Sequence, residues 1–299
     1  MRRRFVTLDV FTERRFAGNT LAVVLDAENL DTAAMQTVAR EFNHPETVFV
    51  LPAADPAHRA RVRIFTPGTE LPFAGHPTVG TAVLLARLDG GAGAREIVLE
   101  ENIGPVRCRA AMTDGDVGRA SFTLPRLPEE IGAGPDAATA AAALSLDAAD
   151  IGFEDLRPSR WSAGLPQTFL PVRSLAAIGR ARPDPVRFEA AFAFGGRSVV
   201  YLYCGEVAEP GHDFHARMFA PKLGVAEDPA TGSAAAAFAG LLAAHRRMDD
   251  GEHTVRIEQG YEMGRPSLIE LIMSIRNGKL AVATIGGAAV VVTEGAIEI

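Results

Sequence analysis

The chain has 299 residues, of which 47% are hydrophobic and 22% charged, and its formal net charge is −7. This composition excludes a disordered chain and argues against broad binding to nucleic acid or anionic membranes. The longest unbroken apolar run, 234–244, is about half of a membrane span. We therefore expect a soluble, cytoplasmic protein that acts on small molecules and is long enough for two domains.

Alternating polar and apolar residues dominate the first part of the chain and predict a sheet. Asp31 is a candidate N-cap for a helix that ends near residue 42, and a stretch rich in Ala and Leu predicts a helix over 78–88. The predicted strands cover 5–11, 21–25, 47–51, 59–66, 96–101 and 106–112. Strands and helices mixed in this way predict an α+β lobe.

The second part of the chain shows the same mixture. Asn277-Gly278 between two alternating runs predicts a two-residue hairpin turn. Cys108 and Cys204 lie in alternating apolar segments, so we interpret them as core residues and expect neither a disulfide nor a zinc site. The predicted elements are strands near 167–172, 198–207, 215–221 and 253–259 and helices near 184–194 and 230–245.

The sequence contains an internal duplication. In the first half RIFTP (63–67) precedes HPTVGTA (76–82), and in the second half RMFAP (217–221) precedes DPATGSA (228–234). Each copy has a strand that ends in proline, a loop, a polar residue before proline, and a Gly-Thr/Ser-Ala helix opening. Two copies of this length favour a pair of pseudo-symmetric domains over a solenoid.

The duplication predicts two lobes. We place the N-terminal lobe at residues 1–117, with the extreme C-terminal residues a candidate to pack on it, and the C-terminal lobe at residues 118–299.

The two helix openings are candidate anion sites. Gly80 and Gly232 stand where the helices are predicted to begin, next to Thr81 and Ser233, and free backbone N–H groups at a helix start attract a carboxylate or phosphate. Well-capped helices without a ligand are the alternative. If the pseudo-twofold axis brings the openings together, they form a cleft between the lobes, where ligand sites are common.

Three residues are candidates for proton chemistry. His76 and Asp228 occupy equivalent positions of the duplication, which predicts that they face each other across this cleft. Glu46 stands at the entrance to an apolar strand, where partial burial would make it a proton carrier. A core histidine, a turn-forming aspartate and a solvent-facing glutamate are the structural alternatives.

The sequence favours neither a metal nor a cofactor. No G-x-G-x-x-G or P-loop motif indicates a nicotinamide or ATP cofactor. Ser233 has no neighbouring histidine in sequence, so anion binding fits it better than nucleophilic attack. The other histidines share no metal-ligand spacing; they are His44, His58, His212, His215, His245 and His253.

Segments 46–49, 65–77 and 227–234 resemble the signature segments of the PhzF family of phenazine-biosynthesis isomerases. Further counterparts at 9–11, 16–19, 164–166, 259–267 and 286–287 extend the resemblance from end to end. The resemblance implies a diaminopimelate-epimerase-like fold: α+β, with two lobes, each a mostly antiparallel curved sheet or open barrel around a central helix.

The resemblance also implies an activity. The family's best-known member isomerises trans-2,3-dihydro-3-hydroxyanthranilate without a cofactor, and family members are often homodimers. Glu46 would shuttle the proton, with His76 and Asp228 as polar partners around a small carboxylate. The implied substrate-binding residues are Pro67, Gly75, Thr231, Gly232 and Ser233.

Two departures from the family pattern concern the substrate. Thr20 stands where the family often has proline, and His44-Pro45 precede Glu46 where smaller or apolar residues are common. Pocket walls can change while the fold and the proton chemistry persist. An epimerase or racemase of a hydroxy or amino acid and a non-catalytic carboxylate-binding module stay open. Related epimerases use two cysteines, but His76 and Asp228 occupy those positions here, which disfavours a two-thiol racemase.

Overall fold

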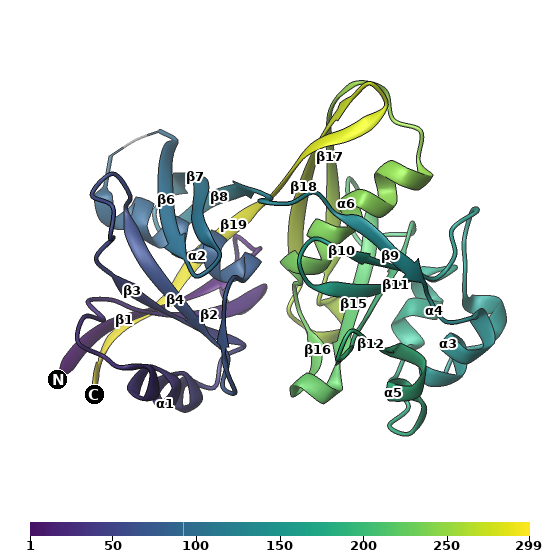
Figure 1. The fold of residues 1–299 in the computed structure, drawn as a ribbon, viewed down its shortest axis with the longest axis horizontal. Coiled ribbons are helices and arrows are strands. Elements are labelled where there is room, and N and C mark those ends of the chain that lie inside the picture. Colours follow the sequence, from purple (N-terminus) through teal and green to yellow (C-terminus); the bar gives the residue numbers. More distant parts are fainter. Residues whose placement is uncertain (92) are drawn as a thin grey trace. The chain divides into compact units, whose positions relative to one another are not determined.

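The computed structural model describes residues 1–91 and 93–299, and the chain divides into two compact units (Figure 1). The first unit comprises Met1–Thr123 and Gly286–Ile299, and the second comprises Leu124–Ile285. The first boundary falls after residue 123 rather than 117 because the strand that follows residue 116 pairs with the preceding strand. The C-terminal residues belong to the first unit because they pair with its first strand.

The first unit is a mixed, mostly antiparallel sheet with two helices. Only the pairs β2–β3 and β4–β6 are parallel among the strand pairs described in this unit. Its elements are β1 (Arg2–Val10), β2 (Asn19–Val24), α1 (Thr32–Phe42), β3 (Glu46–Leu51), β4 (Ala60–Phe65), β5 (Glu70–Leu71), α2 (Gly75–Asp89), β6 (Arg95–Glu101), β7 (Gly104–Asp114), β8 (Val117–Thr123) and the end of β19 (Lys279–Glu298).

Helix α2 is the central helix of this unit. Its residues are buried from Gly75 to Ala86, and it contacts β1, β2, β3, β6, β7 and β8 (Figure 1). A helix that is apolar on every face can only be stable in a core. Helix α1 is amphipathic instead, begins at the predicted N-cap Asp31, and buries Met35 and Val38 against an apolar cluster beneath it.

Helix α2 begins earlier than the sequence predicts. It starts at Gly75 rather than Thr78, because Pro77 lies in the first turn, where a backbone N–H has no helical partner to lose. Gly80 is therefore inside the helix and the expectation that it opens the helix is wrong. A Cβ at Gly80 would lie 2.6 Å from Leu21 and 2.7 Å from Val10, so this glycine allows the helix to approach β1 and β2.

The second unit repeats the plan of a sheet around one buried helix. Helix α6 is the central helix: it contacts β9, β10, β11 and β18, and the Phe238 ring stacks on Phe169 of β11. The elements are β9 (Glu129–Ala133), α3 (Ala137–Ala143), β10 (Ser159–Ser162), β11 (Pro166–Pro171), α4 (Leu175–Arg180), α5 (Arg187–Phe192), β12 (Ala193–Phe194), β13 (Arg197–Ser198), β14 (Val200–Cys204), β15 (Phe214–Ala220), β16 (Val225–Asp228), α6 (Gly232–His245), β17 (Gly251–Gln259), β18 (Ser267–Arg276) and the start of β19.

The predicted hairpin at Asn277-Gly278 is confirmed between β18 and β19. Both residues have positive φ, 53° and 68°, as a two-residue turn of type I′ requires. The Asp250 carboxylate accepts hydrogen bonds from both backbone N–H groups and fixes the turn. Among the residues described, no helix combines the length and apolar character needed to cross a membrane.

Candidate active site

Glu46 and His76 lie side by side in the first unit. Glu46 begins β3 and His76 is in the first turn of α2, and the carboxyl Oε2 is 3.3 Å from the imidazole Nε2. Their side chains are 17% and 6% exposed, so the pair is largely shielded from water. The structure therefore brings together a carboxyl and an imidazole, the two groups most suited to proton transfer near neutral pH.

His76 is neutral, and its position defines the tautomer. Burial lowers the pKa of His76 to about 3, and a hydrogen bond to the backbone of Thr20 offsets this only in part. A backbone contact that favours the protonated ring involves a carbonyl oxygen, so a ring N–H donates to Thr20. Because Nε2 faces Glu46 and makes no such bond, the donor is Nδ1. Nε2 consequently presents a lone pair to the Glu46 carboxyl.

The surroundings of this pair follow from strand pairing. Glu46 pairs with Leu21 on β2, which places it beside Thr20, and the antiparallel pair Thr47–Phe65 places Pro67 just beyond β4 at the same end. The turn at 66–69 is fixed because the Thr66 hydroxyl accepts from the N–H groups of Gly68 and Thr69. Gly75, the first residue of α2, is buried and directly precedes His76.

Asp228 lies in the second unit, at the end of β16. The Thr231 hydroxyl donates to its carboxylate at 2.6 Å, and the amide Nε2 of Gln259 donates to its backbone carbonyl at 2.7 Å. Gln259 also accepts from the backbone N–H of Thr231 at 3.1 Å. Gly232 and Ser233 follow as the first two residues of α6. Asp228, Thr231, Gly232 and Ser233 therefore lie together at the start of α6.

An ion pair anchors the strand that carries Asp228. The guanidinium of Arg217, buried in β15, donates two hydrogen bonds to Glu227 at 2.7 and 2.8 Å. It also donates to the carbonyl groups of Ile178 and Ala181. A bidentate arginine–carboxylate pair resists rotation, so the backbone just before Asp228 is held in place.

Sequence reasoning identified the acidic and imidazole groups but missed the residues that hold them. Thr20 acts through its carbonyl, and Gln259 and Gln167 are buried amides inside strands. No pattern in the sequence distinguishes such amides from exposed ones. The duplication predicted matched openings, but His76 lies inside its helix whereas Asp228 precedes its helix.

The two cysteines lie in strands, as predicted. Both are buried, Cys108 in β7 and Cys204 in β14. Burial raises the pKa of Cys108 far above the ordinary range, and burial raises that of Cys204 to about 12. Thiols that resist ionisation in this way are poor bases at neutral pH.

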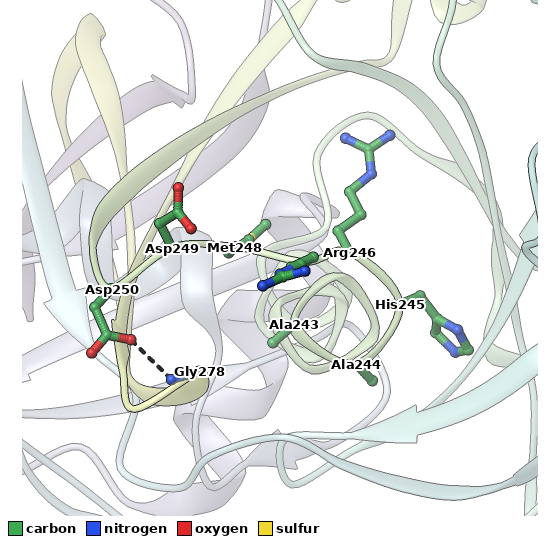
Figure 2. A pocket seen from close by; sticks show the side chains of 9 residues that line it. Ala243, Ala244, His245, Arg246, Met248, Asp249, Asp250 and Gly278 are labelled. Atoms are coloured by element: carbon green, nitrogen blue, oxygen red, sulfur yellow. Dashed lines mark hydrogen bonds between the residues drawn. The ribbon is translucent and has the colours of Figure 1, made fainter.

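A separate surface hollow of about 440 Å³ lies at the opposite end of α6 from Ser233 (Figure 2). Arg246 and His245 line it, but so do Asp249 and Asp250, and Asp250 is already engaged by the hairpin turn. Mixed charge and an open shape make it a poor candidate for the chemistry. Among the described residues, no group of His, Cys, Asp and Glu is arranged to hold a metal ion.

Two units that each wrap a sheet around a buried helix give the chain the diaminopimelate-epimerase-like fold, which solved structures of similar proteins share. Comparison with known proteins gives the family. The chain belongs to the phenazine biosynthesis-like PhzC-PhzF family, whose model matches residues 8–295. The predicted family and fold are thus confirmed, and so is the prediction that the chain is an isomerase.

Relatives and solved structures cover nearly the whole chain. An uncharacterized isomerase of Mesorhizobium japonicum is 51% identical over 305 residues, with 99% of each chain covered. The trans-2,3-dihydro-3-hydroxyanthranilate isomerase of Pseudomonas aeruginosa is 38% identical over 266 residues, with 88% of each covered. A PhzF-family structure from Bacillus anthracis matches with a TM-score of 0.90, 25% identity and full coverage of both chains. A hydroxyproline epimerase from Agrobacterium vitis shares the fold at 13% identity, with a TM-score of 0.61 over 99% of this chain and 91% of that one.

Proposed function

We propose that the protein shifts a double bond in a small cyclic carboxylate by moving a proton without a cofactor, as a trans-2,3-dihydro-3-hydroxyanthranilate isomerase does. The observation that carries the proposal is the shielded contact between Glu46 and the neutral imidazole of His76. The similarity to the Pseudomonas aeruginosa isomerase supports the substrate class.

In this mechanism Glu46 is both base and acid. Its carboxylate takes a proton from one ring carbon, the C–H electrons move into the ring and shift the double bond, and the resulting carboxylic acid returns a proton to another carbon. The lone pair on Nε2 of His76 accepts a hydrogen bond from the protonated carboxyl and so favours the form that has taken up the substrate proton. His76 itself does not need to ionise.

The second unit binds the substrate in this proposal. The N-terminus of α6 offers backbone N–H groups at Gly232 and Ser233 for the substrate carboxylate. Asp228 orients a polar substituent, and its position is fixed by Thr231 and Gln259. Pro67 and Gly75 are assigned to the wall of the substrate site around Glu46.

Replacement of Glu46 tests this assignment. Glu46→Gln keeps the shape but cannot take up a proton, so we expect turnover of trans-2,3-dihydro-3-hydroxyanthranilate to fall by about 10²–10⁴-fold. Binding of the aromatic analogue 3-hydroxyanthranilate, measured by calorimetry, should change little. Glu41→Gln, at an exposed position of α1, is the control and should retain full turnover. Near-normal turnover in Glu46→Gln would refute the role of Glu46.

A further inference from the structure

Gln167 is a buried amide whose side-chain oxygen has no hydrogen-bond partner among the described residues. It lies in β11 and is 1% exposed. Its Nε2 donates to the Ser233 hydroxyl at 3.2 Å, in the first turn of α6. Its Oε1 is buried and has no hydrogen-bond partner among residues 1–91 and 93–299. The amide therefore reaches the start of α6 with an acceptor still available.

Tyr201 presents a second unused polar group on the same face of the sheet. Its ring packs on Phe238 of α6, and its hydroxyl is buried without a partner in the part of the chain that the structure describes. Burial raises its pKa, and the negative charge of Asp228 raises it further. The tyrosine hydroxyl and the Asp228 carboxylate are thus close enough to interact electrostatically.

Strand register connects these groups. Phe169 pairs with Tyr201, Tyr201 with Met218, and Met218 with Asp228, which forms one row across four strands. Gln167 precedes Phe169 by two residues and so points to the same side of β11. Gln167 and Asp228 therefore lie beside the N-terminal turn of α6, and Tyr201 lies on the same face, against Phe238 in the second turn.

Packing alone does not account for a glutamine here. Phe169, two residues further along the same face of β11, packs its ring on Phe238 of α6, and an apolar side chain at position 167 would carry no buried unpaired oxygen. Buried polar atoms are nearly always paired in folded proteins, and exceptions call for a functional explanation. A ligand that brings its own donor supplies the missing bond.

We propose that Gln167 determines substrate specificity: its side-chain oxygen accepts a hydrogen bond from an amino or hydroxyl group on the carboxylate substrate. This inference rests on the proposed function, because it assumes that the substrate carboxylate lies at the start of α6. The ligand class it defines is a small ring carboxylate with an N–H or O–H donor close to the carboxylate. Asp228 and Tyr201 are the further polar groups that such a substituent meets.

Calorimetric titration with benzoate, 2-aminobenzoate and 3-hydroxyanthranilate tests the proposal. The unaltered protein should bind the two substituted compounds about tenfold or more tightly than benzoate, which corresponds to one well-formed hydrogen bond. Gln167→Met should reduce this preference severalfold, to what the contacts with Asp228 and Tyr201 supply, and leave benzoate affinity almost unchanged. Gln167→Glu retains an acceptor, so it should keep the preference while weakening all three ligands by charge repulsion.

Replacement of a second glutamine is a control that distinguishes ligand recognition from a structural role of the amide. Gln36 of α1 donates to the Thr66 carbonyl at 2.9 Å, so Gln36→Met removes a structural hydrogen bond and should leave the ligand preference intact. Without ligand, Gln167→Met should melt within a few degrees of the unaltered protein, because removal of the unpaired buried oxygen offsets loss of the hydrogen bond to Ser233.

Three results would overturn the proposal: an unchanged preference in Gln167→Met, loss of the preference in Gln167→Glu, or no preference in the unaltered protein. A melting temperature several degrees lower in ligand-free Gln167→Met would also overturn it, since the amide would then be structural. A different result would contradict the proposed function without contradicting the role of Gln167. Normal ligand preference without isomerisation would contradict the role of Glu46 and leave that of Gln167 in place.

Discussion

His76 owes its neutral state to its place at the start of a buried helix. Burial removes the water that would stabilise a charged ring, and the positive end of α2 adds to the effect. With a pKa of about 3, the ring keeps one charge state across the range in which the protein is expected to work. Any change of activity between mildly acidic and neutral pH therefore originates in groups other than His76.

His215 differs from His76 because its pKa is raised rather than lowered. It is 1% exposed in β15, and its ring nitrogens lie 2.6 Å from Glu258 and 3.0 Å from Glu262. Burial alone would lower its pKa, but hydrogen bonds to the two carboxylates outweigh burial and raise it to about 9. This histidine is therefore an imidazolium held between two acids, and its charge contributes to the stability of the second unit.

Because the pKa of His215 is raised, its charged form stabilises the fold at low pH, and this stabilisation is lost at high pH. Its contribution is complete below the ordinary value of 6.5 and is lost as the pH rises through about 9. When the pH rises from about 6 to about 9.5, the unfolding free energy of the unaltered protein should fall by about 2–3 kcal/mol more than that of His215→Gln. Urea unfolding at both pH values measures this difference.

His245→Gln, at an exposed position at the end of α6, is the control for this experiment and should behave like the unaltered protein. Identical pH dependence in His215→Gln and the unaltered protein would show that the buried imidazolium is not formed.

At the scale of elements, the close approach of α2 to its sheet depends on Gly80. A methyl group there would lie 2.6–2.7 Å from the side chains of Leu21 and Val10, well inside contact distance. Gly80→Ala should therefore destabilise the protein by about 1–3 kcal/mol, although alanine is the better helix former. Chemical denaturation measures the change.

Gly68→Ala is the matched control, because a Cβ there would meet no atom closer than 3.9 Å. We expect its unfolding free energy to stay within about 0.5 kcal/mol of the unaltered value. A Gly80→Ala protein as stable as this control would mean that α2 can move away from β1 and β2 at no cost.

Periodicity in the sequence predicted many of the elements but not their contacts, and it missed β8, β9 and β10 and the short helices α3 and α4. The alternation in 5–11 and 106–112 comes from strands that pack on one face, and those strands are present as β1 and β7. The start of α2 was misplaced because Pro77 resembles a helix stop when it is in fact in the first turn. Helix openings predicted from glycine alone were therefore right for Gly232 and wrong for Gly80.

For the candidate site, too, the sequence predicted residues but not their contacts. Sequence resemblance identified Glu46 and His76, but their 3.3 Å contact depends on the parallel pairing of β2 with β3 and on the packing of α2. These are long-range features that no local pattern contains. Gln167 could not be identified in advance, because a glutamine in a strand is usually exposed.

At the scale of the whole molecule, the unit that carries Glu46 and His76 is built from both ends of the chain. β1 pairs with β19 from Arg2–Glu298 to Val10–Ala289, so the two termini lie together (Figure 1). The sheet around α2 is complete only when the C-terminal strand has joined it. The unit that holds the Glu46–His76 contact therefore needs strands from both ends of the sequence, and the family model likewise spans residues 8–295.

The most direct measurement is the fate of the proton when the unaltered protein turns over trans-2,3-dihydro-3-hydroxyanthranilate in heavy water. We expect nuclear magnetic resonance to show a shifted double bond and one solvent deuteron at the carbon that receives the proton, and neither change with Glu46→Gln. Deuterium at a stereocentre without a double-bond shift would instead indicate an epimerase and contradict the account.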